Sequence, residues 1–136
     1  QWPTKAYFFV VEEMGGTFAL FRIDNETGID GLSSIMYRPE GSSQTFLLGR
    51  EILEWPENWA HADPLPVLVH VYEWNGQDWV LADTKHKDYY AKVVLPPLEA
   101  KLAQGPCPDE DAALQAKCRH SLEKEIAAVK AILAAP

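Results

Sequence analysis

The chain has few of the groups from which catalytic centres and nucleic-acid surfaces are built. Its 136 residues include two cysteines, two methionines and four histidines, and 12 basic residues stand against 20 acidic ones. The net charge of -8 at pH 7 argues against nucleic acid as a partner, because that affinity comes from Lys and Arg contacts with phosphates. An acidic surface fits a solubilising role, and it also fits a basic protein partner.

Motifs for catalysis and for cofactor binding are missing as well. The sequence has no H-E-x-x-H, no C-x-x-C, no G-x-S-x-G and no phosphate-binding glycine loop. Asp24, Glu26 and Asp30 carry oxygens that suit Ca²⁺, but they lack the fixed spacing of an EF-hand, and turn formation explains them better. We therefore expect a non-enzymatic protein with no cofactor and no metal.

Long apolar runs are absent, so no segment is predicted to span a membrane. A chain of this length with 47% hydrophobic residues is expected to form one globular domain over residues 1–136. It begins at Gln1 without methionine, and an even cysteine count in a short chain is typical of an oxidising compartment. We expect a periplasmic or secreted protein.

The clearest structural signal lies in Val67–Lys85, which reads as a β-hairpin around Asn75-Gly76. A two-residue loop would place Glu73 opposite Asp78, and like charges in that position are unfavourable. The preferred register is therefore a four-residue loop that pairs Trp74 with Trp79. In either register one face carries Tyr72, Trp74 and Trp79, and this aromatic face is either buried or an exposed patch.

Further strands are predicted on both sides of this hairpin, before a helical C-terminal region. The predicted strands are Thr4–Glu13, Thr17–Ile23, a short one at Ile35–Tyr37, Gln44–Arg50 and Tyr89–Leu95. The predicted class is α+β, mainly antiparallel, with a sheet or sandwich of about 6–7 strands over residues 1–95. Residues 96–136 are expected to be helical, with an amphipathic C-terminal helix packed on the sheet.

The two cysteines constrain this helical region. Leu98–Gln104 is predicted to be a short helix that ends before Gly105, and a long helix is predicted from about Asp109. Its apolar positions recur at helical spacing: Leu114, Cys118, Leu122, Ile126, Val129 and Leu133. Because 11 helical residues rise about 16 Å and a disulfide needs Cα atoms within about 7 Å, a Cys107–Cys118 bond requires the chain to double back. We predict this bond, with the long helix starting later.

The most unusual segment is residues 51–66, which combine two tryptophans, three prolines and four acids. Prolines exclude a long helix or a central strand here, and a loop of this length in a compact domain is usually functional or disordered. The predicted partner-binding residues are Glu54, Trp55, Glu57, Asn58, Trp59, His61 and Asp63. Alternatively, the two tryptophans cap one end of the sheet.

Trp and Tyr are enriched among residues that carry binding energy, and acids steer a basic partner. The leading hypothesis is an inhibitor or immunity-type protein that inserts this acidic loop into a basic secreted enzyme, such as a cell-wall hydrolase. A second hypothesis is a carrier for a sugar or an apolar ligand, in which Tyr72, Trp74 and Trp79 line an aromatic cup. A third is a structural subunit of an envelope assembly.

Overall fold

The structure is a computed structural model of the chain. It describes the backbone of residues 8–14, 17–23, 35–37, 46–60, 62–108 and 110–136, and the side chains of the last three ranges. The chain divides into two compact units. The first consists of Gln1–Glu51 with Val69–Ala82, and the second of Ile52–Leu68 with Asp83–Pro136.

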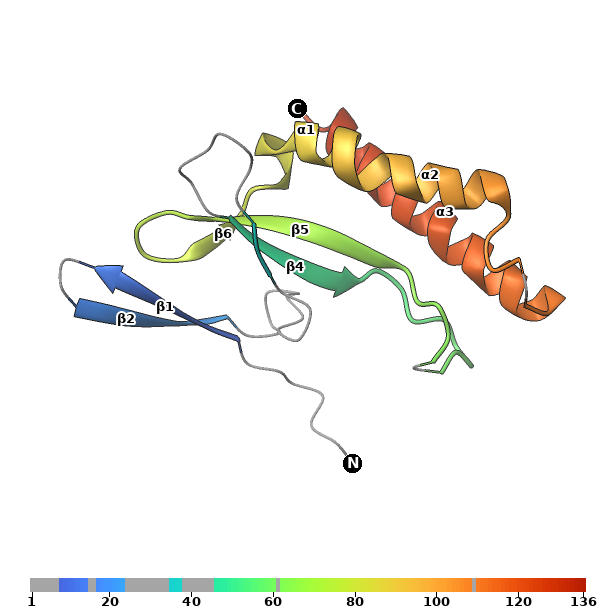
Figure 1. The fold of residues 1–136 in the computed structure, drawn as a ribbon, viewed down its shortest axis with the longest axis horizontal. Helices are drawn as coiled ribbons and strands as arrows, with labels where there is room; N and C mark the ends of the chain where they lie inside the picture. The colour runs from blue at the N-terminus through green and yellow to red at the C-terminus, as the bar shows by residue number, and fades with distance from the viewer. Residues whose placement is uncertain (1–7, 15–16, 24–34, 38–45, 61, 109) are drawn as a thin grey trace. The chain divides into compact units, whose positions relative to one another are not determined.

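The strands form two separate sheets (Figure 1). In the first sheet, β1 (Phe8–Met14) pairs antiparallel with β2 (Thr17–Ile23). The second sheet has the order β3-β4-β5-β6, and its strands are β3 (Ile35–Tyr37), β4 (Phe46–Ile52), β5 (Val67–Trp74) and β6 (Trp79–Leu81). The prediction of an α+β protein rich in antiparallel strands is confirmed, but a single sheet or sandwich of 6–7 strands is not supported.

The turn between β5 and β6 has the predicted four-residue form, with Trp74 opposite Trp79. Asn75 organises it, because its side-chain Oδ1 accepts hydrogen bonds from the backbone N–H groups of Gln77 (2.9 Å) and Asp78 (2.8 Å). Gly76 has φ of 101°, a conformation that L side chains rarely adopt. Turn chemistry in the sequence therefore fixes the register of this hairpin.

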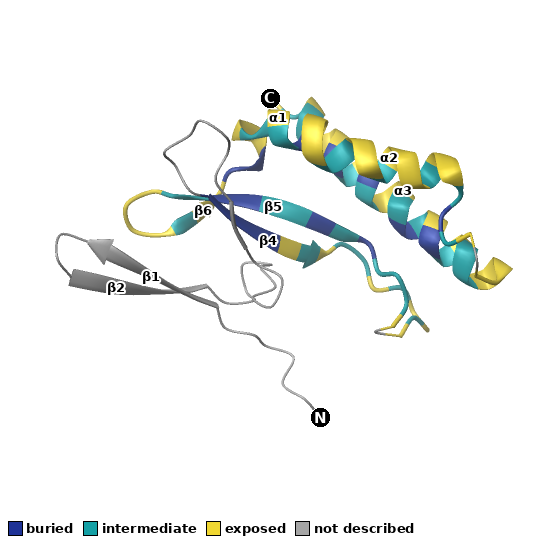
Figure 2. Cartoon of the chain, in the orientation of Figure 1, coloured by how far each residue is buried: buried dark blue, intermediate teal, exposed yellow. Residues whose placement is uncertain are grey.

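Both faces of β5 are covered at its centre (Figure 2). Val71 is fully buried on one face, and Tyr72, on the other, is 4% exposed. On β4, Phe46, Leu47 and Leu48 are buried as well. Neighbouring residues of a strand point to opposite faces, so consecutive buried residues show that these two strands are covered on both sides.

The second arm of the hairpin ends earlier than predicted, because Asp83–Lys85 forms a 3₁₀ turn, η2. A helical stretch follows, made of α1 (Lys87–Tyr89), the π-helical turn η3 (Tyr90–Val94) and α2 (Leu95–Gln104). The predicted strand at Tyr89–Leu95 is therefore wrong.

The physical reason is that a short apolar run fits a strand or a helix equally well, and tertiary contacts decide. Tyr90 is fully buried, and its hydroxyl donates to Asp83 Oδ1 at 2.6 Å. Val93, three residues further along, is 54% exposed. The prolines fall in the first turn of α2, where missing N–H groups are tolerated, and α2 ends before Gly105 as predicted.

The C-terminal helix α3 (Ala112–Ala134) packs against α2, and the two lie side by side in Figure 1. Asp111 caps its N-terminus, accepting from the Leu114 N–H at 2.8 Å. Of the predicted apolar positions, Cys118, Ile126 and Val129 are buried, and the other three are half-buried. No helix among the described residues has the length and the apolar character that crossing a bilayer requires. Packing of α3 on the sheet stays a prediction.

The predicted disulfide is present. Cys107 and Cys118 are bonded, with their Cα atoms 6.3 Å apart. The chain doubles back directly after α2, where Cys107 has φ of 51° and its carbonyl accepts from the Glu110 N–H at 3.1 Å. The long helix accordingly begins at Ala112, after the reversal.

Candidate functional site

The segment rich in tryptophan, proline and acids forms a closed loop in the second unit. We call residues 54–65 the tryptophan loop. A hydrogen bond from the Leu53 N–H to the Pro66 carbonyl, 2.9 Å long, closes its base. Two internal turns shape it, from the Trp59 N–H to the Pro56 carbonyl (3.1 Å) and from the Asp63 N–H to the Ala60 carbonyl (3.0 Å).

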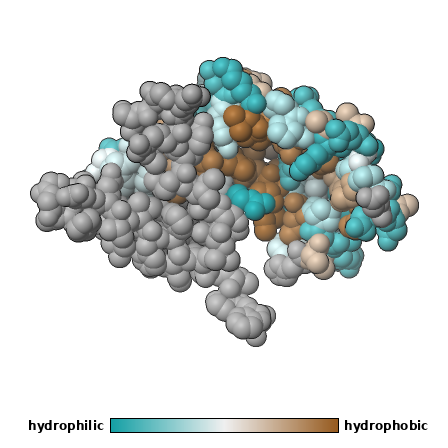
Figure 3. Space-filling view, in the orientation of Figure 1, coloured by the Kyte–Doolittle hydropathy of each residue, from teal (hydrophilic) through white to brown (hydrophobic). Residues whose placement is uncertain are grey.

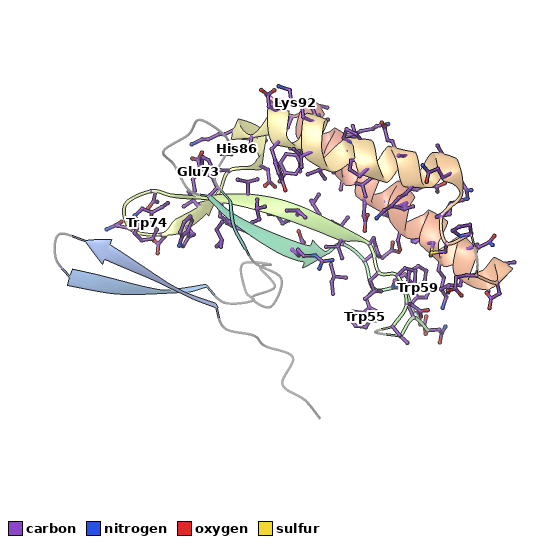
Figure 4. All side chains as sticks on the ribbon, viewed as in Figure 1. Trp55, Trp59, Glu73, Trp74, His86 and Lys92 are labelled. Atoms are coloured by element: carbon purple, nitrogen blue, oxygen red, sulfur yellow. A yellow bond between two sulfur atoms is a disulfide. The ribbon has the colours of Figure 1, made fainter. Side chains whose placement is uncertain are left out.

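The two tryptophans of the loop have different environments (Figure 4). Trp55 is 44% exposed, and its indole Nε1 donates to the Trp59 carbonyl at 2.9 Å. Trp59 is half-buried against α3, with its ring 5.6 Å from the His120 ring and 5.4 Å from Lys117 Nζ. A cation over an indole face is attracted by the ring quadrupole, so Trp59 anchors the loop, and Trp55 is the more exposed of the two tryptophans.

Asp63 provides a second attachment of the loop to α3. Its Oδ1 accepts from Lys117 Nζ at 2.9 Å, and its Oδ2 accepts from the Ala60 N–H at 2.7 Å. The pKa of Asp63 is lowered, mainly by the hydrogen bond from Lys117 and then by the one from the Ala60 N–H. Both hydrogen bonds favour the charged carboxylate. Lys117 therefore contacts both Trp59 and Asp63.

Glu54 provides a third attachment. Its Oε2 lies 2.9 Å from His120 Nε2 and 3.6 Å from Lys124 Nζ. The hydrogen bond with His120 is the main cause of a lowered pKa of Glu54, and the charge of Lys124 adds to it. Two acids of the loop are thus compensated by bases of the same chain.

The far end of the loop and the start of β5 are attached to α3 through polar side chains. The Ser121 hydroxyl donates to the Pro64 carbonyl, and Glu125 Oε1 accepts from the Val67 N–H at 2.9 Å. Sequence reasoning missed all five attachment residues of α3, Lys117, His120, Ser121, Lys124 and Glu125. Their recurrence at three- and four-residue spacing, which marks one helix face, was the signal available.

The predicted partner-binding residues are brought into one loop, but with different exposure. Glu57 and Asn58 are exposed at its tip, and Asn58 has φ of 69°. Glu57 has no ion-pair partner in the part of the chain whose side chains are described. Glu54, Trp59 and Asp63 are half-buried. His61 lies outside the described residues.

The second predicted patch, on the hairpin of the first unit, is largely packed. Trp74 and Trp79 contact each other with ring centroids 5.8 Å apart, and both are half-buried. Tyr72 is buried. Nearby, His70 Nε2 is 2.5 Å from Glu51 Oε2. The aromatic residues thus contribute to the packing of the hairpin.

No group of three or more His, Cys, Asp or Glu residues suited to a metal ion occurs among the described residues. Asp24, Glu26 and Asp30, the calcium candidates, lie outside that set.

The second unit also contains a groove of about 610 Å³ between α2, α3 and the disulfide. It is bordered by the end of the tryptophan loop, at Pro64 and Leu65. Hydrophilic side chains are prominent on the visible surface of this helical unit (Figure 3), whereas the groove includes leucines, prolines and the disulfide.

No family model, no curated protein and no solved structure matches this chain.

Proposed function

We propose that this chain is a non-enzymatic binding protein whose tryptophan loop docks on another protein, in the manner of an inhibitor or immunity-type protein. The observation that carries the proposal is Trp55: its side chain is 44% exposed although its indole N–H is bonded to the Trp59 carbonyl. A large aromatic side chain held in one orientation at the surface is typical of residues that dominate protein interfaces.

The attachments to α3 support this proposal because they order the loop before any partner arrives. Trp59, Asp63 and Glu54 each contact a base of α3, and Ser121 holds the Pro64 carbonyl. Ordering a loop costs conformational entropy, and a loop that is already ordered avoids this cost on binding. The half-buried Trp59 then acts as a support for Trp55.

The electrostatics favour a basic partner, but fewer acids of the loop are open to that partner than the sequence suggested. Glu54 and Asp63 are compensated by Lys117, His120 and Lys124, so Glu57 is the acid that the described loop offers most openly. The net charge of -8 for the chain provides the long-range field that attracts a positive protein. A basic secreted enzyme, such as a cell-wall hydrolase, is the proposed target.

The disulfide is compatible with the proposed periplasmic or secreted location. Disulfides form and persist in oxidising compartments, and the Cys107–Cys118 bond closes the reversal between α2 and α3. An exported binding protein also has to resist unfolding without the support of cytosolic chaperones. A crosslink between the α2–α3 reversal and the second turn of α3 contributes to this stability.

The test is capture of proteins from the exported fraction of the source organism on three immobilised baits: the wild type, Trp55→Ala and Trp74→Ala. The third bait is the matched control, since Trp74 belongs to the second predicted patch on the β5–β6 hairpin. We expect the wild type and Trp74→Ala to retain a basic protein that Trp55→Ala loses. Loss on Trp74→Ala with retention on Trp55→Ala would move the binding surface to the hairpin and contradict the proposal.

A further inference from the structure

The groove beside the disulfide has two helical walls that come from regular spacing. Leu98, Lys101 and Gln104 of α2 lie three residues apart, so they share one face. On α3, one face carries the lining residues Cys118, Ser121, Leu122 and Glu125. The rest of the lining includes Leu65, Pro106, Pro108 and the disulfide. Its volume of about 610 Å³ is in the range of sites for small ligands, roughly 300–1,000 Å³.

The interior of the groove is apolar because its most buried polar group is already engaged. Ser121 is buried, and its hydroxyl donates to the Pro64 carbonyl. Leu65, Leu98 and Leu122 line the groove with aliphatic surface. A ligand inside it would therefore gain mainly from removing its own apolar surface from water.

The charges of the groove lie on opposite walls. Lys101 on α2 is exposed and has no ion-pair partner among the described side chains. Its neighbour Gln104 is exposed as well. Glu125 on α3 is half-buried, with Oε1 bonded to the Val67 N–H at 2.9 Å. Lys101 thus places a cation without a described ion pair on the α2 wall of the groove, in a chain with 20 acids against 12 bases.

We infer that this groove binds a small amphipathic monocarboxylate, with its aliphatic tail between Leu98 and Leu122 and its carboxylate paired with Lys101. A straight-chain fatty acid of medium length has this chemistry. Gln104, one helical turn from Lys101, offers an amide N–H as a second donor to the head group. This site is separate from Trp55, so it stands or falls independently of the protein-binding proposal.

The experiment is calorimetric titration of the oxidised full chain with sodium hexanoate, octanoate and decanoate below their micelle concentrations. We expect saturable binding that tightens about 15-fold for each pair of added methylenes, because each buried CH₂ contributes about fourfold. Octan-1-ol and octylammonium serve as neutral and cationic probes with the same tail. An octylammonium affinity equal to or above that of octanoate would overturn the inference, since Glu125 rather than Lys101 would then select the ligand.

Two sets of variants locate the ligand. Lys101→Gln should weaken octanoate by about two- to fivefold, as expected for an exposed ion pair, and leave octan-1-ol unchanged. Lys92→Gln, which removes an exposed lysine paired with Asp88, is the matched control and should change neither. Leu122→Trp and Leu98→Trp fill the groove from opposite walls. Each variant whose far-UV circular dichroism spectrum matches that of the wild type, and which is therefore folded, should lose octanoate binding.

Two further results would refute the site. The first is wild-type protein that gives no saturable heat with any of the three carboxylates. The second is octanoate binding that survives both tryptophan substitutions. Trp55→Ala, by contrast, should bind octanoate as the wild type does, which separates failure of this inference from failure of the proposed protein-binding function.

Discussion

Removing the disulfide should destabilise the protein by an amount that follows from its loop length. Cys107 and Cys118 are 11 residues apart, and the chain-entropy relation gives a crosslink over that loop about 2.8 kcal/mol of stabilisation. For a chain of 136 residues with an unfolding entropy of about 2.1 cal/mol/K per residue, this corresponds to a Tm lower by about 10 °C. The α2–α3 reversal should lose order first, because the bond ties Cys107 in the reversal to Cys118 in the second turn of α3.

The assay is thermal unfolding followed by far-UV circular dichroism, on oxidised wild type, reduced wild type and a Cys107→Ala/Cys118→Ala variant. Reduction keeps both side chains, so it isolates the crosslink, whereas the alanine variant also removes the buried Cys118 thiol. We expect both to unfold at lower temperature than the oxidised protein, and the alanine variant at the lowest. A reduced protein with the Tm of the oxidised one would refute the reasoning.

Three other predictions concern the tryptophan loop. The pKa values of Glu54 and Asp63 are lowered in the folded protein. The two carboxylates therefore stabilise the fold above the ordinary carboxyl pKa of about 4. This stabilisation is lost as pH falls through the lowered pKa values. Urea midpoints measured against pH should therefore fall less steeply at acidic pH for Glu54→Gln/Asp63→Asn than for the wild type; equal slopes would contradict the attachments to α3. Trp59→Ala should cost about 1–3 kcal/mol in urea unfolding, as expected for a half-buried aromatic, and Trp55→Ala under about 1 kcal/mol; the reverse order would assign the anchoring role to Trp55. Association with the basic partner should slow as salt is raised, and a salt-independent on-rate in stopped flow would argue against electrostatic steering.

Features set by local chemistry could be predicted from the sequence. Asn75-Gly76 and the repulsion between Glu73 and Asp78 were enough to place Trp74 opposite Trp79, as found. Gly105 marked the end of α2. The cysteine spacing, combined with the rise of a helix, required the chain to reverse before α3.

Features set by long-range contacts could not be predicted. Tyr89–Leu95 has the composition of a strand, and it is helical because Tyr90 is buried with its hydroxyl on Asp83. The sequence predicts Glu54 and Asp63 as charges for a partner, but Lys117 and His120, more than 50 positions further along the chain, contact them. Local sequence does not encode such pairs. The number of acids in a loop therefore does not predict how much negative charge the folded loop exposes to a partner.

The most direct test of the proposed function is the affinity of the purified partner for wild type, Trp55→Ala and Trp74→Ala, measured by calorimetry. If the tryptophan loop is the docking surface, Trp55→Ala should bind at least about 30-fold more weakly, the loss typical of an interface residue that carries much of the binding energy. Trp74→Ala should bind as the wild type does. Equal affinity of the wild type and Trp55→Ala would contradict the account.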